Sequence, residues 1–219
     1  AQDEILGRLS DANTGAKIIS ALKSMTLHYD KIIIASTLKD TNIAGRSLKT
    51  ISDDAGLSPE EAILKILLTN DLQVSIFNEV ISEENLFEIA RKDYAAISSD
   101  GLGLGSEGLK NNLAHPRSFG GFTRALQLLV KEKGILSWEE TIYKMAGLPA
   151  SIVGLEKRGQ IKESFFADVV VFDPETIRDR ADYKNPRRFS DGIRWLFVNG
   201  IAVIADGNLT GNMPGQILT

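Results

Sequence analysis

The chain of 219 residues contains no cysteine and only two histidines, His28 and His115. The absence of cysteine excludes a disulfide scaffold, a thiolate zinc site, an iron–sulfur cluster and a cysteine nucleophile. Two histidines make a self-contained multi-histidine metal site very hard to build. A complete metal site of that kind is therefore not expected within this chain.

Long apolar runs and an excess of positive charge are also missing. No apolar stretch approaches the roughly 20 residues that a helix needs to cross a bilayer. The net charge is −4 and the isoelectric point about 5.3, which argues against non-specific binding to nucleic acid or to anionic membranes. We expect a soluble protein of a reducing compartment, the cytoplasm, with no nucleic-acid or membrane partner.

Three short apolar segments, residues 31–36, 73–77 and 94–98, are typical of buried strands. Helical patterns separate them, and strands that alternate with helices indicate βα units and a parallel sheet. Three strands alone rarely form a stable two-sided sheet, so we expect these units to be part of a larger fold.

Capping signals and apolar spacing predict the helices. Ser58, Ser82 and Ser137 each precede a helix start with acidic residues in the first turn. The predicted helices cover residues 1–27 with a break at 13–15, and then 45–56, 59–69, a segment after Ser82, 120–134, 138–145 and 149–155.

The last third of the chain changes from helical to strand-like periodicity. Residues 168–173 and 193–204 predict strands, and Asn199-Gly200 between two apolar runs is a strong hairpin signal. We therefore expect a small β region here. The basic pairs Lys157-Arg158 and Arg187-Arg188 are interpreted as solvated surface.

Asp100 is the first candidate for chemistry. It follows the third predicted strand and opens a glycine-rich segment, and active sites of parallel barrels lie at the carboxyl ends of strands. A carboxylate there can bind a metal ion or take a proton from water. The alternative is a turn-capping aspartate followed by Gly101 at positive φ, which the spacing by itself favours.

His115-Pro116-Arg117 lies further along the same predicted loop, residues 101–118. Arginine offers a planar fork for a carboxylate, and histidine carries protons near neutral pH. The alternative is a solvated arginine and a surface histidine. The glycines at 101, 103 and 105 lack the further residues of a phosphate-binding motif, so nucleotide binding is not expected.

These segments together resemble a known family. Residues 98–101, 115–117 and 120–124 are similar to the N-acyl-D-amino-acid deacylases, or D-aminoacylases, of the amidohydrolase superfamily. The similarity continues through residues 144–150, 154–155, 158–161 and 167–174, and then 192–193, 198–200 and 210–211. It covers the chain from about residue 32 onward.

The resemblance implies an α/β fold: an eight-stranded (β/α)8 metal-dependent hydrolase barrel with a small β-sandwich. The three βα units match the last three of the barrel, so we expect barrel elements in residues 1–158 and part of the β-sandwich in residues 159–219. The family's metal-binding histidines would lie before Ala1. We therefore expect the C-terminal fragment of a longer enzyme, which needs the N-terminal half of the barrel. Exposed strand edges and helix faces would favour self-association.

The resemblance also implies chemistry. Such enzymes use zinc to activate a water that attacks the amide carbonyl of an N-acyl-D-amino acid. Asp100 matches the aspartate that binds metal and acts as general base and then acid. Arg117 matches the arginine that holds the substrate carboxylate, with His115 beside it in the substrate site. Asp100 alone supplies one zinc ligand, so this chain is expected to bind zinc weakly and to be inactive by itself.

Two other functions stay open. The chain could be a non-catalytic amidohydrolase-like module for binding or assembly, or one chain of a split enzyme. An in-frame upstream sequence that encodes a His-x-His strand supports the fragment, whereas a start codon next to Ala1 supports the module.

Overall fold

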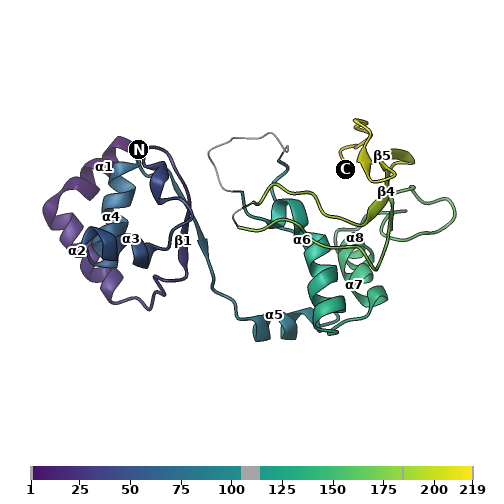
Figure 1. The fold of residues 1–219 in the computed structure, drawn as a ribbon, viewed down its shortest axis with the longest axis horizontal. Coiled ribbons are helices and arrows are strands. Elements are labelled where there is room, and N and C mark those ends of the chain that lie inside the picture. Colours follow the sequence, from purple (N-terminus) through teal and green to yellow (C-terminus); the bar gives the residue numbers. More distant parts are fainter. Residues whose placement is uncertain (1, 105–113, 184, 219) are drawn as a thin grey trace. The chain divides into compact units, whose positions relative to one another are not determined.

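The computed structural model describes residues 2–104, 114–183 and 185–218, drawn in Figure 1. The chain divides into two compact units, residues 1–80 with 107–115 and residues 81–106 with 116–219. Much of the predicted loop 101–118, including the glycine at position 105, lies outside the described residues. None of the described helices combines the length and the apolar character that a membrane span needs.

The first unit packs helices against a short strand pair that lies at its edge (Figure 1). Its elements are α1 (Gln2–Ser10), α2 (Ala12–Lys23), β1 (Ile32–Thr37), the 3₁₀ turn η1 (Thr41–Ile43), α3 (Leu48–Ala55), α4 (Pro59–Thr69) and β2 (Val74–Asn78). Its core joins Ile32 and Ile34 of β1 to Leu48 of α3 and Ile66 of α4. These side chains are the apolar positions that the helical and strand patterns predict to be buried.

Side-chain caps decide where these helices begin. The Ser58 hydroxyl accepts the Glu61 N–H at 3.3 Å while the Glu61 carboxylate accepts the Ser58 N–H at 2.8 Å, which confirms the predicted capping box. The helical region 1–27 is interrupted as predicted, but at Asp11 rather than at 13–15, because the Asp11 carboxylate accepts the Thr14 N–H at 2.8 Å and caps the start of α2. Gly15 lies inside α2, where a Cβ would be 3.2 Å from Leu64 Cδ2.

The strands of the first unit pair differently from the expected parallel sheet. β1 and β2 form an antiparallel ladder, with Ile32 opposite Asn78 and Thr37 opposite Val74. A parallel partner for β1 would have to be another barrel strand, and the described residues of this sheet supply only β2. An antiparallel ladder is also slightly more stable per residue than a parallel one.

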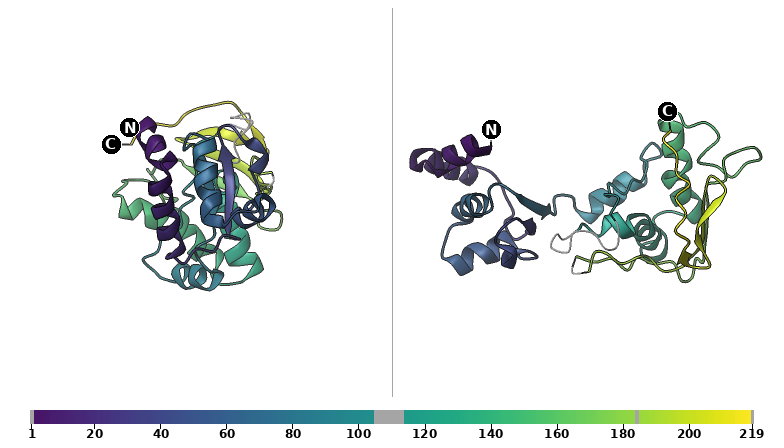
Figure 2. Two further views of the ribbon diagram at one scale, coloured as in Figure 1. Left: turned by 90° about the vertical axis from the view of Figure 1, so that its left-hand side faces the viewer. Right: turned by 90° about the horizontal axis from the view of Figure 1, so that it is seen from above.

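The second unit combines helices with a small sheet (Figures 1 and 2). Its elements are α5 (Glu83–Ala90), α6 (Arg117–Ala125), the π-helical segment η2 (Leu126–Glu132), α7 (Trp138–Met145), α8 (Gly147–Ile152), β3 (Val169–Phe172), β4 (Ile193–Val198), β5 (Ile201–Ala205) and β6 (Asn208–Leu209). Ala90, Leu129 and Leu136 form its helical core. The predicted helix 120–134 is present, but it begins earlier, at Arg117, and continues as a π-helix after Ala125.

The predicted third strand, residues 94–98, is not a strand. The Ile97 N–H donates to the carbonyl oxygen of Lys144 at 2.9 Å, at the end of α7. The Lys144 ammonium, in a side chain that is buried, donates to the carbonyl oxygen of Ala95 at 3.3 Å. Backbone groups that a neighbouring strand would satisfy in a barrel are thus bound by α7.

The predicted β region forms an antiparallel sheet in the order β3-β4-β5-β6. Asn199 and Gly200 join β4 to β5 with φ values of 50° and 80°. Positive φ at both positions is the requirement of a type I′ turn, which matches the twist of the strands. The predicted Asn-Gly hairpin is confirmed.

Arg158 ties this sheet to the segment that follows α8, so its interpretation as solvated surface is wrong. Its side chain is only 11% exposed and forms an ion pair with Asp168. It also donates to Asn199 Oδ1 at 2.7 Å, and its guanidinium lies 4.1 Å from the centre of the Phe166 ring. Asp168 in turn accepts the Asn199 N–H at 2.8 Å. We call these four residues the Arg158 clasp.

Gly192, just before β4, predicts a large loss of stability on substitution. Its φ is +88°, and a Cβ there would lie 2.5 Å from the backbone N and Cα of the fully buried Ile177. Gly192→Ala should therefore lose roughly 2–5 kcal/mol, the sum of left-handed backbone strain and overpacking. Urea unfolding followed by tryptophan fluorescence measures this loss.

Gly207→Ala is the matched control for this prediction. Gly207 has a similar φ of +79°, but the nearest atom to its Cβ position is Ile193 O at 3.7 Å. This substitution should show the backbone strain alone, about 1–2 kcal/mol. Equal losses in the two variants would show that contact with Ile177 is unimportant.

Candidate active site

Asp100 lies in an exposed turn. Its carboxylate-bearing side chain is 83% exposed. The Ser98 hydroxyl accepts the Asp100 N–H at 3.4 Å, and the Ser99 hydroxyl accepts the Gly101 N–H at 3.2 Å. Asp100 itself has a φ of +44°, whereas the turn-capping interpretation expects positive φ at Gly101, which is not in that region. The turn therefore presents the Asp100 carboxylate outward.

Arg117 is the first residue of α6, and its guanidinium meets this carboxylate. Arg117 Nη2 lies 2.7 Å from Asp100 Oδ2, and the arginine side chain is 44% exposed. An ion pair this exposed contributes at most about 1 kcal/mol to stability. Both groups are thus held together while remaining accessible from solvent.

Gly120 is one of two adjacent glycines in α6, and Asp179 occupies the space that a side chain at Gly120 would need. A Cβ at Gly120 would lie 1.8 Å from Asp179 Oδ1, so only glycine admits this carboxylate beside the helix. The Asp179 N–H donates to Gln127 Oε1 at 3.1 Å, and the Ala181 N–H donates to the carboxylate at 2.8 Å. Burial raises the pKa of Asp179, and the hydrogen bond from Ala181 partly opposes that rise. This contact fixes one side of α6.

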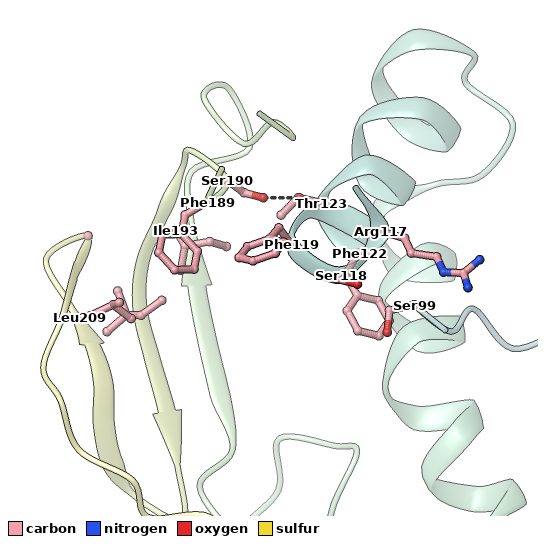
Figure 3. Close-up of a pocket in the computed structure, with 13 residues that line it drawn as sticks. Ser99, Arg117, Ser118, Phe119, Phe122, Thr123, Phe189, Ser190, Ile193 and Leu209 are labelled. Atoms are coloured by element: carbon pink, nitrogen blue, oxygen red, sulfur yellow. Dashed lines mark hydrogen bonds between the residues drawn. The ribbon is translucent and has the colours of Figure 1, made fainter. Parts of the chain in front are cut away.

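A pocket of about 370 Å³ lies within the second unit, between α6 and the sheet (Figure 3). Its lining combines apolar side chains with hydroxyl groups: Phe119, Phe122, Phe189, Ile193, Ile204 and Leu209, with Ser99, Ser118, Thr123 and Ser190. The Thr123 and Ser190 hydroxyls are hydrogen-bonded to each other across it. Figure 3 shows the Arg117 side chain extending away from Phe119 and Ile193. The guanidinium is therefore directed toward Asp100 rather than into the apolar part of the pocket.

His115 belongs to the first unit. Its ring meets Phe77 edge to face, with the ring centres 5.1 Å apart and an angle of 82° between the planes. Of the three residues predicted to form the site, the structure brings Asp100 and Arg117 together within one unit and places His115 in the other.

The donor atoms of the described residues do not by themselves make a zinc site. Among the described residues, no group of three or more histidine, aspartate or glutamate side chains is arranged to hold a metal ion. Zinc in enzymes takes three protein ligands or more. Asp100 can supply one carboxylate oxygen, and the other ligands would have to come from outside the described residues.

Small residues around Asp100 are the part of the site that sequence reasoning missed. The Ser118 hydroxyl accepts a hydrogen bond from the backbone next to the turn. Gly121 has no side chain, which lets Ser99 lie close to the helix. Neither feature has a periodic or charged signal in a single sequence. Ser118 lies between two segments of the resemblance, residues 115–117 and 120–124, and Gly121 lies within the second of them.

Similarity to known proteins supports the resemblance. Residues 114–209 match the model of the amidohydrolase family. The chain is 39% identical to a D-aminoacylase of Alcaligenes xylosoxydans xylosoxydans over 201 residues, which cover 89% of this chain and 39% of that protein. It is 33% identical to an N-acyl-D-aspartate deacylase of the same organism over 175 residues, 80% of this chain and 33% of that protein.

Solved structures show the same relationship. An N-acyl-D-glutamate deacylase of Bordetella bronchiseptica, solved with zinc and a phosphonate inhibitor, superposes with a TM-score of 0.70 and 29% identity over 88% of this chain and 38% of that chain. A D-aminoacylase studied for its binuclear metal centre gives a TM-score of 0.72 and 28% identity over 94% of this chain and 45% of that chain.

These matches bear directly on the expected fold class and on the extent of the chain. The chain spans only about a third to two fifths of the length of these two curated relatives. The match to solved deacylases confirms the expected fold class, a mixed α/β part of the amidohydrolase fold with a small sheet. Residues 114–209 thus fit the model of the amidohydrolase family, and most of the chain is similar to a part of the N-acyl-D-amino-acid deacylases.

Proposed function

We propose that this chain is the C-terminal part of a zinc-dependent enzyme that hydrolyses N-acyl-D-amino acids to a D-amino acid and a carboxylate. The observation that carries the proposal is the exposed ion pair between Asp100 Oδ2 and Arg117 Nη2, which lie 2.7 Å apart. These are the carboxylate and the guanidinium that the family resemblance assigns to the reaction. The similarity to deacylases over most of the chain supports the same reaction type.

Asp100 is proposed to act on protons and on the metal. Its exposed carboxylate would supply one ligand, accept the proton of the attacking water, and then return that proton to the amide nitrogen that leaves. Bound zinc supplies the positive charge that acidifies water and polarises a carbonyl group. A carboxylate that is both accessible and held in a fixed turn suits this role.

Arg117 is proposed to bind the carboxylate of the D-amino acid. Its planar guanidinium can hold a carboxylate with two parallel hydrogen bonds. The ion pair of Arg117 Nη2 with Asp100 Oδ2 at 2.7 Å supports this role, because the guanidinium already lies beside a carboxylate group. His115 is proposed to lie beside the same substrate in the intact enzyme.

The rest of the barrel is the proposed partner of this chain. We propose barrel elements in residues 1–158 and part of the β-sandwich in residues 159–219. Large apolar side chains of the described residues are exposed, including Val80, Ile81 and Ile89. Such surface is suited to burial against further barrel elements, or against a second copy when those are missing. The acidic, cysteine-free composition supports a cytoplasmic location, which stays a prediction.

The purified chain by itself is expected to show no zinc-dependent hydrolysis of N-acetyl-D-amino acids. One carboxylate cannot hold a zinc ion tightly, so the activated water is missing. Release of free D-amino acid with added zinc measures this, with the full-length gene product as the positive control.

Co-expression with the upstream half of the same enzyme should restore turnover if the two halves assemble. Hydrolysis by the chain alone would contradict the fragment proposal. An inactive full-length product would contradict the proposed reaction itself and would favour a non-catalytic module.

A further inference from the structure

We propose that Ser118 and Gly121, in the first two turns of α6, are positioning residues that hold the turn carrying Asp100. This inference rests on the function proposed for Asp100. It concerns the backbone that presents the carboxylate rather than the atoms that would contact substrate.

Ser118 binds the chain just after the turn. Its hydroxyl accepts the N–H of Leu102 at 3.1 Å. The neighbouring residue, Arg117, holds the Asp100 carboxylate at 2.7 Å. Consecutive residues of α6 therefore hold both the side chain of Asp100 and the backbone two residues beyond it.

Glycines allow the turn to lie directly on the helix. A Cβ at Gly121 would be 3.2 Å from Ser99 Cβ and 3.4 Å from Ser99 Cα. A Cβ at Gly101 would be 3.0 Å from Ser118 Cα. Ser99 and Ser118 both line the pocket drawn in Figure 3. The residues on either side of Asp100, Ser99 and Gly101, thus lie directly against the backbone of α6.

The backbone of Asp100 needs such support. Its φ of +44° is a left-handed conformation that costs free energy in any residue with a side chain. Such conformations persist where the surrounding structure holds them, and they are common at functional sites. The local bond from the Asp100 N–H to the Ser98 hydroxyl is long, at 3.4 Å, whereas the bond to Ser118 is shorter. The helix is therefore a major anchor of the turn.

Amide hydrogen exchange of the present chain tests the anchor. Ser118→Ala should speed exchange of the Leu102 N–H by about three- to tenfold, since one hydrogen bond is lost. Ser118→Thr keeps the hydroxyl and should restore slow exchange. Ser151→Ala is the matched control, because the Ser151 hydroxyl bonds within α8 to Leu148 O. Unchanged Leu102 exchange in Ser118→Ala overturns the proposal.

Kinetics of the full-length enzyme test the functional role. A carboxylate displaced by a fraction of an ångström should lower kcat about ten- to hundredfold, while KM changes little. Ser118→Ala and Gly121→Ala should both show this split, and Ser118→Thr should return most of the lost kcat. The thermal midpoint of each variant separates misplacement from general unfolding.

The outcomes distinguish this inference from the proposed function. If Leu102 exchange rises but kcat stays within twofold, the positioning role is wrong while the role of Asp100 stands. If Asp100→Asn leaves the full-length enzyme active, the proposed function fails and the positioning role fails with it. A fall in kcat that is accompanied by a lowered thermal midpoint and is not restored by Ser118→Thr would also overturn the inference, because loss of folded enzyme would explain it.

Discussion

Replacing Asp100 by asparagine in the full-length enzyme is expected to lower kcat/KM for N-acyl-D-amino acids by about 10²–10⁴-fold. An amide cannot take the proton of the attacking water, and losses of this size follow removal of a general base. Asparagine keeps the size of the side chain and tolerates the positive φ at this position. Initial rates with saturating zinc measure the effect, and folding is checked by circular dichroism.

Asp206→Asn is the matched control for this experiment. Asp206 also has a positive φ, 46°, and its side chain is 76% exposed and 3.8 Å from Arg194. It resembles Asp100 in conformation, exposure and charge but lies in the turn between β5 and β6. Its substitution should leave the rate unchanged. If Asp100→Asn keeps more than a tenth of the activity, Asp100 is not the general base.

Replacing Arg158 by alanine is expected to lower the free energy of unfolding by roughly 3 kcal/mol or more. The substitution leaves Asp168, whose side chain is 33% exposed, without its guanidinium partner. It also removes the bond to Asn199 Oδ1 and the packing against Phe166. The Asp168 carboxylate keeps partial access to solvent, so the loss combines its missing ion pair with the lost hydrogen bond and packing of the largely buried arginine. Urea unfolding of the chain measures the loss.

Arg194→Ala supplies the comparison. Arg194 also lies in the sheet, on β4, but its side chain is 63% exposed and its distance to Asp206 is 3.8 Å. An exposed pair contributes about 0–1 kcal/mol, so this variant should be nearly as stable as the parent. Arg158→Lys keeps the charge but not the planar fork, and should lie between the two. Equal stability of the alanine variants would mean that the Arg158 clasp does not stabilise the fold.

Local signals in the sequence were sufficient for the serine-capped helix starts and for the hairpin. The capping box at Ser58 and the one at Ser137 act within a single turn, and both are present in the structure. Asn199-Gly200 needs only the backbone freedom of its own two residues. The resemblance, in turn, singled out Asp100 and Arg117 because their motifs are contiguous in the chain.

Strand pairing could not be derived in this way. The segments 31–36 and 94–98 have the apolar runs of buried strands, yet one pairs antiparallel with β2 and the other is bound by α7. A strand forms only when its backbone hydrogen-bonds to a neighbouring strand. The sequence of one segment does not identify which segment that neighbour is. The pattern predicted burial correctly only for the first of the three segments, because Ile76 and Tyr94 of the other two are 50% and 78% exposed.

The sequence by itself thus determined the helix starts that a serine caps, at Ser58, Ser82 and Ser137, and the hairpin turn, and it singled out the two charged residues of the candidate site. Tertiary structure alone decided that the Arg158 side chain is only 11% exposed, that Asp100 takes a left-handed backbone, and that the Ser118 hydroxyl accepts the Leu102 N–H. The physical reason is the range of the interactions. Caps and tight turns are settled by neighbours along the chain, whereas burial, ion pairing and a strained backbone depend on groups that only folding brings together.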